Sequence, residues 1–256
     1  MKKLYVFITV REQSSRLNQK CFKPFGPKNS VLEWVCARVN ATDCLIPVIC
    51  TGESGRNQNV INFAAENNIE YFSGPEDNKI KRWNECANHL NVDTFHALDC
   101  DDPFFDPHRI IESMNLLEDS SVEVVLPSDY SDGGAATEGF SIRAKSLNFS
   151  SQLEDTANTE MCYSFFKNKL HSIKLPDPLY AIEKVRLTLD YQEDYNFLNK
   201  LAFTLDLRIS RELVEEYLSE NYEETPNFSI NSLWKDNQHQ LTEETYENFS
   251  RAKQVL

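Results

Sequence analysis

Leu4–Val10 reads LYVFITV, an unbroken run of aromatic, β-branched and other apolar residues near the start of the chain. A strand that does not alternate apolar with polar residues is buried on both faces, which is typical of a parallel sheet covered by helices. A polar loop with three cationic residues follows at once, over residues 11–20. Ser30 and Glu33 then have the spacing of a capping box and predict a helix through about Val39. Strand, loop and helix in this order predict the first part of a βαβ unit.

The same alternation continues along the chain. Further strands are predicted at 45–50, 69–72, 94–98, 122–126, 140–142 and 185–190. Further helices are predicted over about 60–65, 80–90, 107–117, 192–203 and 211–218. Residues 144–184 show no clear pattern, and from about residue 221 the chain is a polar tail with few apolar anchors. Without an internal repeat or linker, we expect one α/β domain over residues 1–256.

Composition limits the classes of partner. The net charge of −14 argues against nucleic acid, which needs a basic face, but a few local cations can still bind a small phosphorylated ligand. The seven cysteines show no CxxC spacing and are expected to be reduced core residues, which indicates a cytoplasmic protein. The apolar run after Met1 is too short for a signal peptide, and no run has the length of a membrane span.

Four carboxylates follow the predicted strand at 94–98 within eight residues, namely Asp99, Asp101, Asp102 and Asp106. Carboxylates held this closely repel one another unless a cation compensates them, and their oxygens suit Mg²⁺ or Mn²⁺. A solvated acidic loop is the alternative interpretation. Asp106 precedes Pro107 and fits a helix start, and Asp102 is also expected to be structural.

Three polar segments fall at the predicted carboxyl ends of strands: residues 11–20, residues 99–102 and Asp190. Open α/β sheets bind ligands beyond these ends, so cations and carboxylates there predict a site for a metal and a nucleoside triphosphate. Asp190 could also cap the helix that follows it. The sequence has no Walker A, GxGxxG or GxSxG motif, which disfavours P-loop, dinucleotide and serine-hydrolase sites. The five histidines show no ligand spacing, and Trp83, Phe104 and Phe105 are expected in the core.

Motifs in a fixed order resemble those of sugar-acid cytidylyltransferases. Residues 8–20, ITVREQSSRLNQK, resemble the nucleotide-binding signature (P)AR-x-GS-x-RLPGK. Residues 72–83 (FSGPEDNKIKRW) resemble FRGSEDDVLDRY, and residues 100–107 (CDDPFFDP) resemble GDCPLIDP. Residues 186–194 (RLTLDYQED) resemble RLTVDTPED, and residues 228–231 (FSIN) lie where the family has a late isoleucine-asparagine. The chain is therefore similar to the spore-coat polysaccharide biosynthesis protein F group, a relative of the 3-deoxy-manno-octulosonate and acylneuraminate cytidylyltransferases.

The resemblance implies a Rossmann-like three-layer α/β/α fold of the nucleotide-diphospho-sugar transferase type, with a mixed, mostly parallel sheet and a possible homodimer. It implies transfer of CMP from CTP to a sugar acid or related acidic metabolite for surface polysaccharide, with release of pyrophosphate. Carried over by position, two groups of residues are implied. The catalytic residues are Arg11, Lys20, Asp101 and Asp190, of which Asp101 and Asp190 hold Mg²⁺ or Mn²⁺. The nucleotide-binding residues are Arg11, Ser14, Arg16, Lys20, Ser73, Gly74 and Arg82. The general base is not evident, and Asp190 or a metal-bound water is the best expectation.

Several positions depart from the family pattern. The glycine of the GS pair is Gln13, the PG before the lysine is Asn18-Gln19, and the glycine before the metal aspartate is Cys100. The GLDVE motif becomes residues 134–138, without its aspartate, and its later histidine becomes Met161. Two other functions therefore stay open: a glycosyltransferase that uses Asp99-Cys100-Asp101 as a DxD motif, and a non-catalytic homologue.

Overall fold

The computed structural model describes residues 2–134, 138–178 and 183–252, so part of the stretch that resembles GLDVE, residues 135–137, lies outside the described chain. Within these ranges the strands form one seven-stranded sheet of order β3-β2-β1-β4-β6-β5-β7. The strands are β1 Leu4–Val10, β2 Leu45–Thr51, β3 Glu70–Ser73, β4 Thr94–Asp99, β5 Val124–Leu126, β6 Phe140–Arg143 and β7 Ser172–Lys174.

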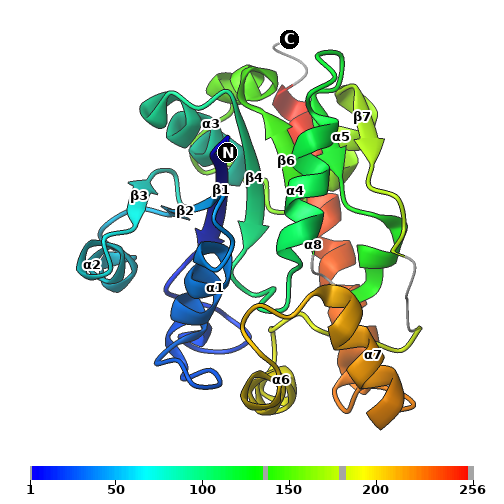
Figure 1. Cartoon of the computed structure of the whole chain (residues 1–256). Coiled ribbons are helices and arrows are strands. Elements are labelled where there is room, and N and C mark those ends of the chain that lie inside the picture. The colour runs from blue at the N-terminus through cyan, green and yellow to red at the C-terminus, as the bar shows by residue number, and fades with distance from the viewer. Residues whose placement is uncertain (1, 135–137, 179–182, 253–256) are drawn as a thin grey trace.

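Strand β1 is an inner strand of the sheet and pairs in parallel with both β2 and β4. Its residue Thr9 is opposite Cys50 of β2 and Asp99 of β4, so the carboxyl ends of these strands meet at one edge, at the bottom of Figure 1. Strand β6 runs antiparallel to β4 and β5, while the other pairings are parallel. The predicted mixed, mostly parallel sheet is confirmed.

Helices join the strands and cover both faces of the sheet. The α-helices are α1 Val31–Asn40, α2 Gln58–Glu66, α3 Lys79–Leu90, α4 Pro107–Leu116, α5 Tyr163–Lys169, α6 Gln192–Thr204, α7 Arg211–Asn221 and α8 Asn231–Ala252. The 3-10 helices are η1 Lys20–Phe22, η2 Asp129–Gly134, η3 Ala144–Gln152 and η4 Phe228–Ile230. Two predicted starts are confirmed, since Ser30 accepts a hydrogen bond from the Glu33 N–H at α1 and Asp106 from the His108 N–H at α4.

The alternation of side chains along β1 divides the core into two halves. Val6 and Ile8 pack with buried residues of α1, α2, α4, α6 and α7 on one face. Phe7 points to the other face, where α3, η3 and α5 contribute the core and its ring stacks on Phe95 with the centroids 4.2 Å apart. The result is the predicted three-layer α/β/α arrangement, with Trp83, Phe104 and Phe105 buried as expected.

The strand predicted at 185–190 is wrong. This segment joins no strand of the sheet, although Leu187 and Leu189 are completely buried. The Leu189 N–H bonds the Asp101 carbonyl at 2.8 Å, and the Arg186 N–H bonds the Thr225 hydroxyl. All six residues 185–190 are buried, and this burial comes from packing against neighbouring loops, not from pairing in the sheet. The seventh strand is β7 instead, which pairs with β5 and lies in the part of the sequence that shows no clear pattern.

The tail after residue 221 also differs from the expectation, because it forms η4 and the long helix α8. Its anchors are mainly polar: Asn231 and Thr245 are buried, and α8 contacts α5 and η2 (Figure 1, red). A hydrophobicity pattern does not register such anchors. The seven cysteines are all unpaired thiols, and no helix in the described ranges is long and apolar enough to cross a membrane.

Candidate nucleotide and metal site

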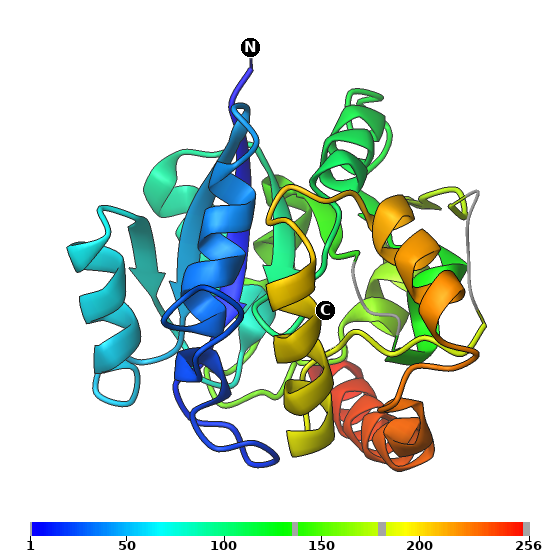
Figure 2. The same cartoon turned by 60° about the horizontal axis from the view of Figure 1, so that its bottom comes forward.

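Four residues from the predicted site form one ion-pair group, which we call the Lys20 cluster: Arg16, Lys20, Asp101 and Asp190. The Lys20 ammonium lies 2.6 Å from an Asp101 oxygen and 2.8 Å from Asp190 Oδ1. Arg16 contacts the same Oδ1 atom at 2.6 Å. Segments about eighty and ninety residues apart thus meet around a single cation. Figure 2, which brings the carboxyl edge forward, shows the loop after β1 together with α6 and α8 along that edge.

Burial away from water strengthens the ion pairs in this cluster. Side-chain exposure is 16% for Lys20 and 3% for Asp190. Burial disfavours the ammonium charge, but Asp101 and Asp190 outweigh it and raise the pKa of Lys20 above its ordinary value. Burial likewise disfavours the carboxylate, but Lys20 and Arg16 outweigh it and lower the pKa of Asp190. Both groups are therefore charged at neutral pH.

The loop after β1 presents Lys20 through an unusual backbone conformation. Leu17 and Cys21 are buried and attach the loop to the core, and the Leu17 N–H donates to the Ser14 hydroxyl. Gln19 has φ +50°, in the left-handed region, just before the 3-10 helix that begins at Lys20. The cytidylyltransferase signature that this loop resembles has glycine at this position, so the conformation that glycine would favour is adopted here by a glutamine. Gln13, by contrast, has no positive φ and an exposed side chain.

A buried ion pair holds Asp190 in place. Arg186 and Asp194 are fully buried and form a bidentate pair with distances of 2.8 and 2.9 Å. Asp194 also accepts hydrogen bonds from the backbone N–H groups of Asp190 and Tyr191. The helix-capping role considered for Asp190 belongs to Asp194, which leaves the Asp190 carboxylate directed at Lys20 and Arg16. These contacts explain the Arg, Asp and Asp spacing of the RLTLDYQED motif.

A second group of alternating charges lies beside the first, and we call it the Lys79 cluster: Arg11, Lys79, Asp99 and Glu160. The Lys79 ammonium lies 2.8 Å from Asp99 and 3.5 Å from Glu160, and Arg11 lies 3.5 Å from Glu160. Arg11 was expected to bind the triphosphate directly, and within the described residues its exposed side chain has this one long ion-pair contact. Lys79 and Glu160 were not predicted as site residues.

Lys79 is the first residue of α3, where the helix dipole disfavours a cation, and its side chain is 3% exposed. Asp99 and Glu160 compensate this charge. The charge of Lys79 is the main cause that lowers the pKa of Glu160, to about 2. Burial opposes this shift, and the charge of Arg11 adds to it. The segment that carries Glu160 is attached to α3, since the Ile80 N–H donates to the Thr159 hydroxyl.

The structure places the second predicted nucleotide-binding loop at the end of β3. The Ser73 hydroxyl donates to the Gly52 carbonyl at 2.7 Å, and the Gly74 N–H donates to the Thr51 carbonyl. Arg82 is 1% exposed, and its guanidinium donates to the carbonyls of Pro75 and Glu76. Arg82 therefore holds the loop, and any contact with a nucleotide would involve its remaining N–H groups.

Three buried polar atoms in these segments have no hydrogen-bond partner within the described chain: Arg16 Nε, Arg82 Nε and Asp102 Oδ1. Burial, followed by the charges of Asp101 and Asp99, raises the pKa of Asp102 well above its usual range. Asp106 has the structural role expected of it, because its second oxygen accepts the Arg211 N–H at 2.9 Å. A buried polar group without a partner calls for an explanation in a native protein, and a bound ion or ligand is one such explanation.

The donor set fits a divalent cation that is shared with phosphate. Asp101 and Asp190 both contact the Lys20 ammonium, so a cation already lies between the two carboxylates. No group of three or more His, Cys, Asp or Glu side chains in the described ranges could hold a metal ion. Mg²⁺ is commonly held by one or two carboxylates together with substrate phosphates and water, so two carboxylates suffice where a triphosphate supplies the other oxygens.

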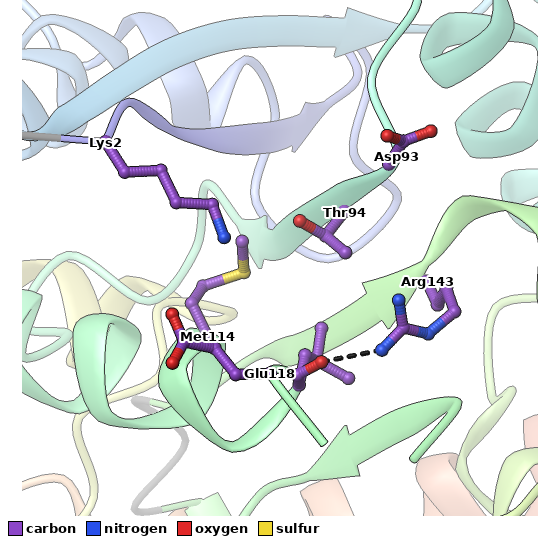
Figure 3. A pocket seen from close by; sticks show the side chains of 7 residues that line it. Lys2, Asp93, Thr94, Met114, Glu118 and Arg143 are labelled. Carbon is purple, nitrogen blue, oxygen red and sulfur yellow. Dashed lines mark hydrogen bonds between the residues drawn. The ribbon is translucent and has the colours of Figure 1, made fainter. Parts of the chain in front are cut away.

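A crevice of about 350 Å³ at the opposite edge of the sheet lacks these features (Figure 3). Lys2, Asp93, Thr94 and Arg143 are among its lining residues, so it lies at the amino ends of β1 and β4. The Arg143 guanidinium donates to the carbonyls of Leu117 and Val122 and is occupied by the fold. Ligands of open α/β sheets bind at the other edge, where the Lys20 cluster lies.

Comparison with known proteins supports the fold. No protein-family model matches the sequence, and no curated protein matches it by sequence. Among solved structures, the chain is similar to a cytidylyltransferase from Leptospira borgpetersenii, with a TM-score of 0.75, 20% identity and coverage of 89% of this chain and 98% of that chain. At this identity the likeness concerns the fold, which is that of the nucleotide-diphospho-sugar transferases.

Two further solved structures share the fold at lower identity. One is CMP:2-keto-3-deoxy-manno-octonic acid synthetase complexed with CTP, with a TM-score of 0.56, 13% identity and coverage of 78% of this chain and 98% of that chain. The other is molybdopterin-guanine dinucleotide biosynthesis protein A from Archaeoglobus fulgidus, with a TM-score of 0.57, 11% identity and coverage of 79% and 100%. Because these identities show the fold alone, the function has to be inferred from the site residues of this chain.

Proposed function

We propose that this protein is a metal-dependent nucleotidyltransferase that transfers CMP from CTP to a sugar acid or a related acidic metabolite and releases pyrophosphate. The observation that supports it most is the Lys20 ammonium between Asp101 and Asp190, beside a cationic loop at the carboxyl edge of the sheet. Cytosine as the base rests on the motif resemblance and on solved neighbours named as a cytidylyltransferase and a CMP synthetase. A role in surface polysaccharide biosynthesis rests on the resemblance to the spore-coat group alone.

In this proposal the Lys20 cluster exchanges partners when substrate binds. Arg16 and Lys20 would turn from the carboxylates to the triphosphate, and Asp101 and Asp190 would hold Mg²⁺ or Mn²⁺. The metal would supply charge neutralisation at the phosphates. Ser14 lies in the same loop and would donate its hydroxyl to a phosphate oxygen, as would the exposed guanidinium of Arg11.

The reaction is an in-line displacement. A hydroxyl oxygen of the acceptor forms a bond to the α-phosphorus, and the bond from that phosphorus to the β-phosphate oxygen breaks, so that pyrophosphate leaves with the electron pair. Lys20 and Arg16 stabilise the charge that develops on pyrophosphate. Asp190 is a poor base in this proposal, because its Oδ1 would bind the metal and its Oδ2 accepts a hydrogen bond from the Trp234 indole N–H. The hydroxyl proton therefore leaves to water.

The glycosyltransferase alternative gains no support from the arrangement of Asp99. A DxD motif uses its aspartates together on one metal and nucleotide, whereas here Asp99 pairs with Lys79 and Asp101 pairs with Lys20. The non-catalytic alternative rested on Gln13 and the missing glycines. Gln13 requires no positive φ, and Cys100 is packed in the core at 5% exposure, so neither replacement distorts the loops that carry the charged residues.

A pyrophosphate-release assay tests the proposal. The protein is incubated with each nucleoside triphosphate, Mg²⁺ and a panel of sugar acids, and we expect release only with CTP and an acidic acceptor. Asp101→Asn is the negative control, and Asp106→Asn, outside both clusters, controls for the loss of a nearby carboxylate. Absence of pyrophosphate together with absence of CTP binding by calorimetry would exclude the proposed function.

A further inference from the structure

Helix α8 reaches the Lys20 cluster through one side chain. The indole N–H of Trp234 donates a hydrogen bond to Asp190 Oδ2 at 2.8 Å. Trp234 is half-buried, and three residues further along the helix Asn237 donates to the Tyr191 hydroxyl at 2.7 Å. The tail is thus attached on both sides of the Asp190–Tyr191 peptide.

The two oxygens of Asp190 have different partners. Oδ1 accepts from Lys20 and Arg16, the cations that the proposed function transfers to phosphate. Oδ2 accepts from the indole N–H of Trp234. This donor carries no charge, so a phosphate does not attract it as it attracts Lys20 and Arg16. When substrate binds, Oδ1 becomes available and Oδ2 stays occupied.

The indole ring of Trp234 packs against the Arg186 guanidinium. The Arg186 guanidinium carbon lies 5.4 Å from the centre of the Trp234 ring and 5.8 Å from that of Tyr191. Arg186 in turn is paired with Asp194, which binds the backbone of Asp190. Backbone and carboxylate of Asp190 are therefore held by one connected network, which fixes the orientation of the carboxylate plane.

We infer that Trp234 is a positioning residue for the metal site: it holds Asp190 Oδ2 so that Asp190 binds the divalent cation through Oδ1 alone. This inference rests on the proposed function, because it assigns the cation to Asp190. Donors that orient a ligating carboxylate typically change metal affinity by 10-fold to 100-fold when they are removed. A tryptophan that only packs α8 onto the fold would leave metal affinity unchanged.

Calorimetry separates these two roles. CTP with Mn²⁺ and CTP in EDTA are each titrated into the wild type, Trp234→Phe, Asn237→Ala and Asp101→Asn. Trp234→Phe keeps a ring beside Arg186 but loses the donor, and Asn237→Ala is the matched control, which loses a bond from the same helix to Tyr191. We expect Trp234→Phe to weaken binding of CTP with Mn²⁺ by about 10-fold and binding of CTP in EDTA by less than about 2-fold. Asn237→Ala should weaken neither by more than about 2-fold.

The outcomes distinguish the two proposals. If the wild type does not bind CTP, or if Mn²⁺ adds nothing to its affinity and Asp101→Asn changes nothing, the proposed function fails and the inference fails with it. If Asp101→Asn loses the Mn²⁺-dependent affinity while Trp234→Phe binds like the wild type, the inference alone is wrong. Equal losses for Trp234→Phe and Asn237→Ala would show that α8 acts only through packing.

A measurement on the wild type covers the case in which Trp234→Phe does not fold. The chain has three tryptophans, and the indole N–H groups of Trp34 and Trp83 donate to Pro103 and Thr9. In a ¹⁵N-tryptophan spectrum, assigned with Trp34→Phe and Trp83→Phe, substoichiometric Mn²⁺ with CTP should broaden the Trp234 indole signal first. Earlier broadening of either other indole would overturn the inference.

Discussion

The Lys20 and Lys79 clusters are built alike but supported differently. Each places one ammonium between two carboxylates, and each ends in an arginine from the loop after β1. Lys20, however, is carried by that loop, whereas Lys79 is the first residue of helix α3 and is 3% exposed. A cation on a loop can turn to a ligand, but a buried cation on a helix cannot leave its carboxylates without a large cost. We therefore expect the Lys20 cluster to exchange ions with substrate. In the Lys79 cluster, we expect Lys79, Asp99 and Glu160 to stabilise the edge of the sheet, while the exposed Arg11 stays available to a phosphate.

The largest expected effect is on turnover in the Lys20 cluster. Asp101→Asn removes one of the two proposed metal ligands and should lower kcat by about 10³-fold. Thermal stability should change little, because in the proposal this carboxylate acts on the metal and nucleotide. Pyrophosphate release and a melting curve measure the two effects. The comparison is Asp99→Asn in the Lys79 cluster, which should mainly lower the melting temperature. A reversed pattern would show that the roles of the two clusters are exchanged.

Lys79→Met should destabilise the fold by about 3 kcal/mol, since it leaves Asp99 and Glu160 without their shared cation. Urea unfolding followed by circular dichroism measures this change. Lys20→Met provides the comparison. It should destabilise the fold less than Lys79→Met, because Arg16 still pairs with Asp190, and it should lower turnover more. Equal destabilisation by the two variants would remove the distinction between an exchanging and a bracing cluster.

Glu160 should make stability depend on pH at acid values. Its pKa in the folded protein is lowered to about 2, below the ordinary value of about 4.3, so its contribution is present above about pH 4.3 and is lost as the pH falls toward 2. The difference in unfolding free energy between the wild type and Glu160→Gln should therefore be largest at neutral pH and shrink on acidification. Glu193→Gln, at an exposed position of α6, is the control for the loss of a carboxylate that has no such ion pair within the described chain. A difference for Glu160→Gln that does not change with pH would contradict the ion pair with Lys79.

The smallest effect concerns the backbone that presents Lys20. Gln19→Gly should stabilise the fold by up to about 1 kcal/mol, because φ is +50° there and a side chain disfavours this region. Asn18→Gly, one residue earlier where φ is not positive, should destabilise the fold instead. Denaturant midpoints of the two variants give the signs. The same sign for both would show that the loop is not strained at Gln19.

Sequence reasoning located the half of the site that follows strands. Asp101 lies two residues after β4, and Lys20 lies in the loop that follows β1. Both strands are buried apolar runs, and such runs identify strands whose carboxyl ends must meet in a parallel sheet. It did not find Lys79 or Glu160, because a lysine that begins a helix and a glutamate in an irregular segment have no periodic signal. One indication for Lys79 was available: it lies within residues 72–83, which resemble a family motif, and it begins a helix, where the helix dipole disfavours a cation.

The sequence by itself determined the α/β class, the mostly parallel sheet and the charged residues at its carboxyl edge, because burial on both faces imposes a continuous apolar pattern on each inner strand. Only the tertiary structure decided how those charges pair, since partners as distant as Lys20 and Asp190 are chosen by packing. It also decided that residues 185–190 lie outside the sheet and that the tail becomes a helix with Trp234 on Asp190. Polar contacts such as these depend on hydrogen-bond geometry and on burial away from water, and a pattern of hydrophobic residues records neither.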